Sequence, residues 1–302
     1  MDTNMIALAV ITLLAATVNG ALGYGFSSIT VPVALFFLTN RVLNPALVPI
    51  EVVLNAYVLW VNRRSIPVVW RRTLPIIVAL APGVAVGTMM VSQVNSSWLK
   101  FFTYVTLLPL ILLQAAGFRR PIRSERAAGF AFGGGLGVLY SVTTISGPPL
   151  AVALSNQGLA QQEFRAALGL IRLAESSMTA VAYAYAGLYS MESARLIPVI
   201  LPSLVIGVPI GAQLIRRIRP DTFRRICMSF DAWIVAFGLS GVLRQLNIIL
   251  GSAAYSVFVG VVIFDLWLLY RFFTGIQTRG LDAWPARVDK PSGPRTYEPT
   301  RS

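Results

Sequence analysis

The fold is decided by two interruptions of long apolar runs, Asn19-Gly-Ala-Leu-Gly-Tyr-Gly25 and Thr143-Thr-Ile-Ser-Gly-Pro-Pro149. Each places helix-breaking residues inside a segment that is otherwise apolar. In lipid, a broken helix leaves backbone N–H and C=O groups unpaired, which is tolerated only where the gap is buried in protein or lines a cavity. The two interruptions lie 124 residues apart. A pair of interrupted segments at corresponding positions of two halves is typical of a transporter binding site.

The composition predicts an all-α, polytopic integral membrane protein. The chain has 302 residues, of which 56% are hydrophobic and 12% charged, with a mean hydropathy of +0.69. A soluble domain is about 25% charged. Apolar runs of about 18 residues or more, each long enough to cross a bilayer, recur along the chain. We expect helices at 5–22, 26–39, 45–61, 73–91, 98–116, 127–141, 147–158, 166–187, 194–215, 226–243 and 248–272, some of them half-helices or re-entrant.

Charge and residue usage exclude several functional classes. The net charge is +13, but the arginines fall in short loops and in the tail, so they indicate topology rather than nucleic-acid binding. Cys227 is the only cysteine and there is no histidine. An intrachain disulfide and a cysteine-cluster metal site are therefore excluded, and the commonest general base is absent. We expect no metal, no cofactor and no enzymatic activity.

Arginine placement predicts the orientation. The rich loops should be cytoplasmic, which puts the N-terminus outside and the tail inside, in a multi-pass protein of the cell inner membrane. Residues 273–302 are polar and contain four prolines, so we expect a disordered cytoplasmic tail. The arginines of the rich set are Arg63, Arg64, Arg71, Arg72, Arg119, Arg120, Arg123, Arg126, Arg216, Arg217, Arg219, Arg224 and Arg225, with Arg271, Arg279 and Arg287 towards and in the tail.

A shift of the chain by 124 residues aligns its rare charged and glycine positions. The arginine-poor loop 92–97 then aligns with the arginine-rich loop 216–221, so equivalent loops lie on opposite sides, as in an inverted repeat. We expect one transmembrane domain over 1–272, with repeats at about 5–118 and 126–245 and an extra helix at about 248–272. Coincidental spacing in a glycine-rich chain is the alternative. The aligned pairs are Arg41 with Arg165, Glu51 with Glu175, Gly83 with Gly207, Gly87 with Gly211 and Gly117 with Gly241.

The second interruption favours an anion site. Proline suits the first turn of a helix, so Pro148 and Pro149 predict the start of a half-helix with Ser146 as its N-cap. The free N–H groups and positive dipole end at such a start suit an anion. A tight turn between two full helices is the alternative. The substrate-binding candidates at the two interruptions are Asn19, Gly23, Gly25, Ser146, Gly147 and Pro148.

Other glycines favour close contacts between helices. This interpretation applies to Gly83, Gly87, Gly207 and Gly211, whereas Gly133 to Gly137 fit either packing or a cavity.

Charged side chains inside apolar segments extend this candidate site. A charge near the bilayer centre costs about 2.5–3.5 kcal/mol on insertion scales, so it usually has a function. Arg172 lies three residues before Glu175, and Arg165 shares its helical face; an arginine there would hold an oxyanion in a bidentate manner. Glu51 and Glu175 are candidates for ion or proton coupling. Asn55, one turn on from Glu51, is a substrate-binding candidate together with Arg165 and Arg172. A structural ion pair is the alternative. Asp231 and Asp265 are expected to be structural.

On these residues the chain resembles the TauE/SafE family of sulfite exporter-like membrane proteins over most of residues 5–270. The resemblance is carried by Asn19-Gly-Ala-Leu-Gly-Tyr-Gly-Phe26 with Pro32, by Gly133-Gly-Gly-Leu-Gly-Val138 with Ile145-Ser-Gly-Pro-Pro-Leu-Ala151, and by Arg165. The family usually has further glycines where this chain has Phe26-Ser-Ser28. The resemblance implies a plasma-membrane permease for small anions such as sulfite, sulfoacetate or other organosulfonates.

The leading hypothesis is therefore a secondary transporter that exports a small anion by alternating access, coupled to a proton or sodium gradient. Its expected partners are the anion, the bilayer and the coupling ion, and an oligomer is compatible with the sequence. One alternative is the membrane subunit of a partner-dependent transport complex, because no G-x-x-x-x-G-K-[ST] nucleotide motif occurs. A membrane-embedded enzyme is disfavoured, because the chain lacks a clustered acidic or histidine metal site.

Overall fold

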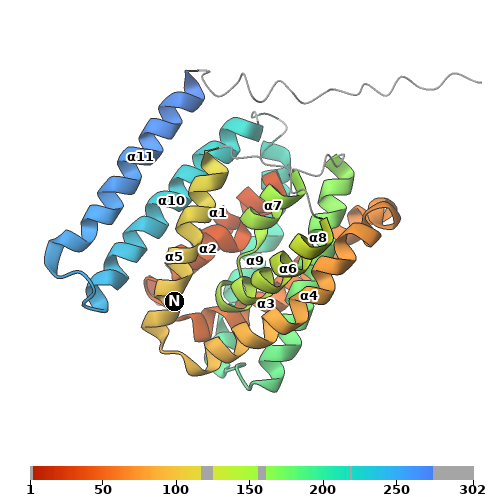
Figure 1. Ribbon diagram of the computed structural model, residues 1–302, viewed down its shortest axis with the longest axis horizontal. Helices are drawn as coiled ribbons and strands as arrows, with labels where there is room; N and C mark the ends of the chain where they lie inside the picture. Colours follow the sequence, from red (N-terminus) through yellow and green to blue (C-terminus); the bar gives the residue numbers. More distant parts are fainter. Residues whose placement is uncertain (1–2, 117–124, 156–160, 216, 218–219, 275–302) are drawn as a thin grey trace, which may run out of the picture.

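The computed structural model describes residues 3–116, 125–155, 161–215, 217 and 220–274, and within them the chain is helical without strands (Figure 1). The all-α prediction is confirmed. The predicted tail 273–302 and the arginines of 117–124 lie outside the described residues, apart from Phe273 and Thr274. The helices are α1 Thr3–Leu22, α2 Phe26–Ala34, α3 Asn40–Val61, α4 Ile66–Gln93, α5 Ser96–Ala115, α6 Glu125–Thr143, α7 Gly147–Ser155, α8 Gln161–Tyr185, α9 Met191–Leu214, α10 Pro220–Gln245 and α11 Ser256–Phe273, with 3₁₀ turns η1 Arg63–Ser65 and η2 Gly251–Tyr255.

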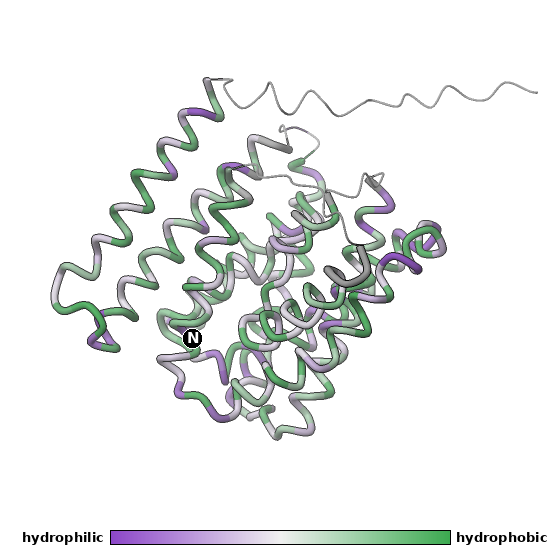
Figure 2. The backbone as a smooth tube through the Cα atoms, viewed as in Figure 1, coloured by the Kyte–Doolittle hydropathy of each residue, from purple (hydrophilic) through white to green (hydrophobic). Residues whose placement is uncertain are grey.

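Seven of the described helices are long and apolar enough to span a membrane: α1, α3, α4 with η1, α5, α9, α10 and α11 with η2. Figure 2 shows hydrophilic residues mainly at helix ends and turns. By contrast, α2 and α7 have nine residues each. At about 1.5 Å per residue they reach less than half of a hydrocarbon core of about 30 Å. The predicted half-helices are therefore present, although α2 ends at Ala34 rather than near 39.

Glycine faces hold two pairs of helices in close contact. A Cβ on Gly211 of α9 would lie 1.8 Å from the Thr17 carbonyl oxygen of α1, and one on Gly83 of α4 would lie 2.1 Å from the Gly134 oxygen of α6. The same holds for Gly133, whose Cβ would meet the Ile76 oxygen at 2.5 Å. The packing interpretation of these glycines is confirmed, because any larger residue would force the backbones apart.

The molecule has two ends, and each is named here after an arginine that lies at it. At the Arg41 end, the Arg41 guanidinium donates to the carbonyls of Val91 and Ser92, where α4 finishes. At the Arg63 end, Arg63 and Gln162 line one open pocket, so the start of α8 lies beside the start of α4. Helix α9 begins where α8 ends, so α4 and α9 run in opposite directions.

The two broken segments, α1–α2 and α6–α7, enter the helix bundle from opposite ends, and each turns back toward the end from which it entered. In the first, Met5 of α1 lies beside Arg195 near the start of α9, and the Leu35 carbonyl that follows α2 accepts from Lys100 near the start of α5. The α1–α2 pair therefore begins and finishes at the Arg41 end. In the second, Gly129 of α6 faces Pro75 of α4 near the Arg63 end. Since α8 also starts there, α6 and α7 form the opposite re-entrant pair.

Most of the described loop arginines gather at the Arg63 end, as the topology prediction requires. Thr3 lies at the Arg41 end and Phe273 at the Arg63 end, so the two described termini are on opposite sides. Several of these arginines lie in helices rather than loops: Arg71 and Arg72 in α4, Arg126 in α6, and Arg224 and Arg225 in α10. Arg225 also differs in burial, because its side chain is 3% exposed and pairs with Asp265 of α11 at 2.7 Å. That buried pair attaches α11 to the rest of the bundle. Which end faces the cytoplasm stays a prediction.

Candidate functional site

The first break is made by two glycines in a backbone conformation that other residues avoid. Gly23 has a φ of 81° and Gly25 a φ of 108°. The Gly23 N–H still bonds the Asn19 carbonyl at 2.7 Å, closing the last turn of α1. Only glycine adopts such φ values without a steric penalty. The chain therefore leaves α1 at Leu22 and starts α2 at Phe26, with the first turn of α2 buried.

The second break uses a strained residue and two prolines. Thr144 has a φ of 55°, which is uncommon for a β-branched residue. The Ser146 carbonyl accepts from Leu150 N–H at 3.1 Å, so Ser146 occupies the N-cap position of α7, as predicted. Pro148 and Pro149 follow, where their missing N–H groups cost no hydrogen bond.

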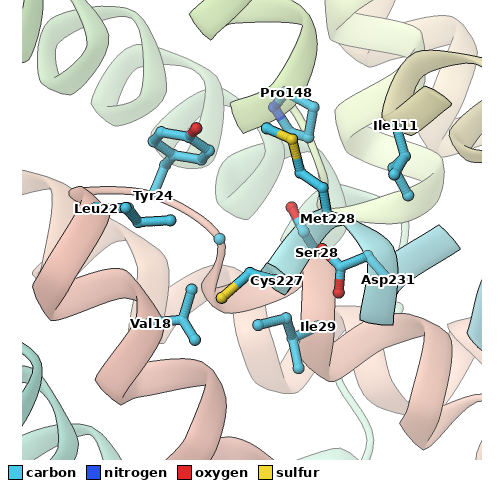
Figure 3. A pocket seen from close by; sticks show the side chains of 11 residues that line it. Val18, Leu22, Tyr24, Ser28, Ile29, Ile111, Pro148, Cys227, Met228 and Asp231 are labelled. Atoms are coloured by element: carbon cyan, nitrogen blue, oxygen red, sulfur yellow. The ribbon is translucent and has the colours of Figure 1, made fainter. Parts of the chain in front are cut away.

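The two breaks touch each other. A Cβ on Gly147 would lie 3.4 Å from the Tyr24 Cβ, so the start of α7 packs directly on the first break. Gly25 and Pro148 also line one small cavity of about 20 Å³ (Figure 3). That volume holds about one water molecule. The meeting point of the breaks is therefore closed in this conformation.

An ionic cluster lies beside this meeting point, centred on Glu51 of α3. The Arg172 Nη2 of α8 lies 3.0 Å from Glu51 Oε1, and the side chains are 4% and 0% exposed. The Tyr140 hydroxyl of α6 donates to Glu51 Oε2 at 2.6 Å. Ser27, in the first turn of α2, also donates to Glu51 Oε1. Four helices thus converge on one buried carboxylate.

A second carboxylate, Glu175 of α8, completes the cluster. The Ser146 hydroxyl donates to Glu175 Oε2 at 2.5 Å, and both residues are fully buried. Within the described chain, Glu175 Oε1 and Arg172 Nε have no hydrogen-bond partner. Buried polar groups are normally paired. These two atoms therefore mark unused hydrogen-bonding capacity for a proton or a bound group.

The two glutamates occupy equivalent local settings. Each accepts a hydrogen bond from a serine at the start of a half-helix: Ser27 of α2 for Glu51, and Ser146 of α7 for Glu175. Glu51 and Glu175 are also one of the two charged pairs that the shift of 124 residues aligns. The shared pattern ties each break to one carboxylate.

Most of the predicted site residues come together here, in ways that partly differ from prediction. Arg172 pairs with Glu51 across the molecule rather than with Glu175 on its own helix. Asn55 Nδ2 donates to the Arg172 carbonyl at 3.4 Å. Asn19 is buried at the first break, and its Oδ1 has no partner among the described residues. Gly23, Gly25, Ser146, Gly147 and Pro148 form the two breaks themselves.

Arg165 is the exception. It is exposed at the Arg63 end, where it lines an open pocket of about 520 Å³ with Arg63, Arg64 and Gln162. It shares a face of α8 with Arg172, but seven residues of helix separate them by about 10 Å. The structure therefore does not bring Arg165 into the cluster.

Three residues near the breaks were missed from sequence. The sequence does indicate Ser27, because this serine starts the half-helix after the first break as Ser146 does after the second. It does not indicate Tyr140, since an aromatic residue in an apolar helix is usually a packing residue. Asp231, expected to be structural, lines the cavity between the breaks, and whether its role is structural stays a prediction. The same expectation is confirmed for Asp265, which pairs with Arg225 and accepts from Trp233 Nε1 at 3.0 Å.

These features define an all-helical, multi-pass membrane protein with two re-entrant helix pairs meeting at a buried ionic cluster. The chain belongs to the family described as "Sulfite exporter TauE/SafE", whose match covers residues 8–239. It is 26% identical over 167 residues to the "Probable sulfite/organosulfonate exporter TauE" of Cupriavidus necator. That alignment covers 52% of this chain and 63% of the relative, so it spans less than two thirds of that protein. No solved structure matches the chain significantly.

Proposed function

We propose that this protein is a secondary transporter that carries a small anion, with sulfite or an organosulfonate as the leading substrate, across the membrane by alternating access. Family membership supports the class of protein, and the name of the Cupriavidus necator relative supports the class of substrate. The observation that carries the proposal is the buried Arg172–Glu51 pair beside the point where the two half-helices meet.

The proposed anion site combines Arg172 with the starts of α2 and α7. At the start of α2 the first N–H groups lack partners within the helix, whereas at the start of α7 only Gly147 of the first three residues carries an N–H, because Pro148 and Pro149 have none. Both starts carry the positive end of a helix dipole. Arg172 is engaged by Glu51 in the closed conformation. An oxyanion therefore has to replace the Glu51 carboxylate as the partner of Arg172. Because a guanidinium binds carboxylates and other oxyanions through the same planar donors, this exchange conserves hydrogen bonds.

Charge balance in the cluster supports proton coupling through Glu51 and Glu175. With both carboxylates ionised, one arginine and two glutamates give a net negative site that repels an anion. Uptake of a proton by either glutamate removes that repulsion. Each binding event would then bring a proton with the anion. Sodium stays the alternative coupling ion.

The arrangement of helices supports alternating access between inverted repeats. Helix order repeats as one long, one short and three long helices over α1–α5 and α6–α10. The packed pairs α1 with α9 and α6 with α4 use aligned glycines, and the two pairs run in opposite directions. Rocking of one half against the other would open the closed meeting point to each side in turn.

We further propose that the Arg63 end faces the cytoplasm of the cell that carries the protein in its inner membrane. In a Cys227→Ser background, single cysteines would be placed at the exposed positions Arg64 and Gln93. An impermeant maleimide added to whole cells should label Gln93→Cys, and should label Arg64→Cys only after permeabilisation. The reverse pattern would invert the proposed topology.

The function is tested by flux. Purified protein in liposomes would take up labelled sulfite, with sulfoacetate and lactate as competitors, with and without a proton gradient. We expect saturable uptake that sulfoacetate blocks and a proton gradient drives. Arg172→Gln should abolish it, whereas Arg71→Gln, a change at an exposed arginine of α4, should not. Absence of flux for every anion would remove this proposal and favour a partner-dependent transport complex.

A further inference from the structure

A third buried carboxyl group lies near the breaks and has no role in the anion site described above. Asp231 of α10 is 8% exposed. No described residue donates a hydrogen bond to its carboxyl group or forms an ion pair with it. An unpaired charge in such surroundings costs far more free energy than a neutral carboxyl group does.

Asp231 borders the cavity between the breaks. It shares the lining with Ser28 of the first turn of α2, with Pro148 of α7 and with Cys227, one turn away on α10. Figure 3 shows the Asp231 carboxyl group beside Ser28 and Met228. The side chain is therefore placed at the start of α2, where N–H groups have no partner within the helix.

The cationic side chains on the helices around Asp231 have other partners. Lys100 of α5 donates to the Leu35 carbonyl, and Arg225 of α10 pairs with Asp265 of α11. Helices α1 and α2 contain no charged side chain in their described residues. The remaining titratable or charged groups in the cavity lining or on α5, η2 and α11 are Tyr24, Cys227, Tyr104, Tyr255, Tyr270 and Arg271.

We propose that Asp231 is a proton-binding residue of the transport path, and that an anion enters between the breaks only while Asp231 carries its proton. An ionised Asp231 and the anion would be like charges competing for the same start of α2, in a region of low dielectric constant. The protonated form removes that repulsion and presents an O–H donor. The inference rests on the proposed anion site and adds to it a proton carrier on α10.

Binding of methanesulfonate to the purified protein tests this coupling. A sulfonate keeps its single charge between mildly acidic and mildly alkaline pH, whereas sulfite changes charge, so methanesulfonate isolates protonation of the protein. We expect wild-type affinity to fall by up to about tenfold per pH unit for each linked proton. Asp231→Asn should lower the number of linked protons by about one, while Asp231→Glu retains it. An Asn variant with the wild-type slope would overturn the proposal.

A ligand-free measurement separates this proposal from the function itself. Infrared spectra of the wild type should contain the carbonyl stretching band of a protonated carboxyl group, and Asp231→Asn should lose part of that band. Identical spectra would reject a proton on Asp231, whatever the protein transports. Failure of the wild type to bind methanesulfonate, together with loss of the band in the variant, would instead reject the sulfonate substrate and leave Asp231 as a proton-binding residue.

Discussion

Arg172 and Glu51 are 121 residues apart in the chain and form a 3.0 Å ion pair with both side chains buried. The pair joins α3 to α8 and places the only arginine of the cluster beside both breaks. Removal of one partner leaves an uncompensated buried charge, whereas removal of both leaves none. This asymmetry allows the structural contribution of the pair to be separated from a role in anion binding.

Arg172→Gln should lower the free energy of unfolding by about 3–5 kcal/mol, because Glu51 loses its cation. The double variant with Glu51→Gln should recover most of that stability and still fail to bind the anion. Thermal unfolding in detergent and methanesulfonate binding would be measured on both variants. Recovery of binding in the double variant would show that Arg172 has only a structural role.

The serines of the two half-helices offer a second prediction. Among the described residues, Ser146→Ala removes the one hydrogen bond to Glu175, and Ser27→Ala removes one of three partners of Glu51. A hydrogen bond to a charged group contributes about 1.5–3 kcal/mol. We therefore expect Ser146→Ala to impair proton-driven flux more than Ser27→Ala does, at similar expression levels. Equal effects of the two changes would argue against a special role for Glu175.

Glu175→Gln gives a direct test of coupling. The glutamine keeps the size of the side chain and can still accept from Ser146, but it cannot exchange a proton. Flux driven by a proton gradient should be lost, while exchange of labelled for unlabelled anion at equal pH should persist. Both assays use the same proteoliposomes. Retained acceleration by the gradient would assign proton movement to Glu51 or Asp231 instead.

The helices and half-helices were predictable because local chemistry determines them. Apolar run length places the spans, and the glycine and proline positions place both breaks. The predicted helix boundaries were inaccurate where a helix end depends on contacts with a residue distant in sequence. Helix α3, for example, starts at Asn40 rather than near 45, and the side chains of Asn40 and Asn44 both donate to the Val142 carbonyl of α6.

The candidate site was only partly predictable, for a similar reason. Sequence spacing pairs Arg172 with Glu175, because side chains three apart share a helical face. The actual partner, Glu51, comes from a helix in the other half of the chain, and no local pattern encodes that contact. Asp231 was likewise judged by the absence of an aligned partner, and its place beside the first break follows from the packing of α10, which the sequence does not encode locally. Long-range packing, not residue type, placed both side chains.

The glycine contacts give a stability prediction with a control in the same helix. A Cβ at Gly133 of α6 would lie 2.5 Å from the Ile76 carbonyl oxygen, whereas one at Gly135 meets nothing within 4 Å. Gly133→Ala should therefore destabilise the protein by about 1–3 kcal/mol through overpacking. Gly135→Ala should be neutral or stabilise it by about 0.5–1 kcal/mol, since alanine favours the helix. Thermal unfolding of both purified variants in one detergent would measure this, and similar losses would contradict the α4–α6 register.

The single cysteine provides a native sensor of opening. Cys227 lines the cavity of about 20 Å³ between the breaks, which leaves no room for a maleimide, but its side chain is only half-buried. Separation of the two halves should therefore raise a basal rate of alkylation. We expect slow labelling of the resting protein and a changed rate when methanesulfonate shifts the balance of open and closed states. Arg172→Gln should keep slow labelling but lose the response to the anion, because it removes binding without removing the cavity. A wild-type labelling rate that methanesulfonate does not change would argue against an anion-linked opening of this cavity.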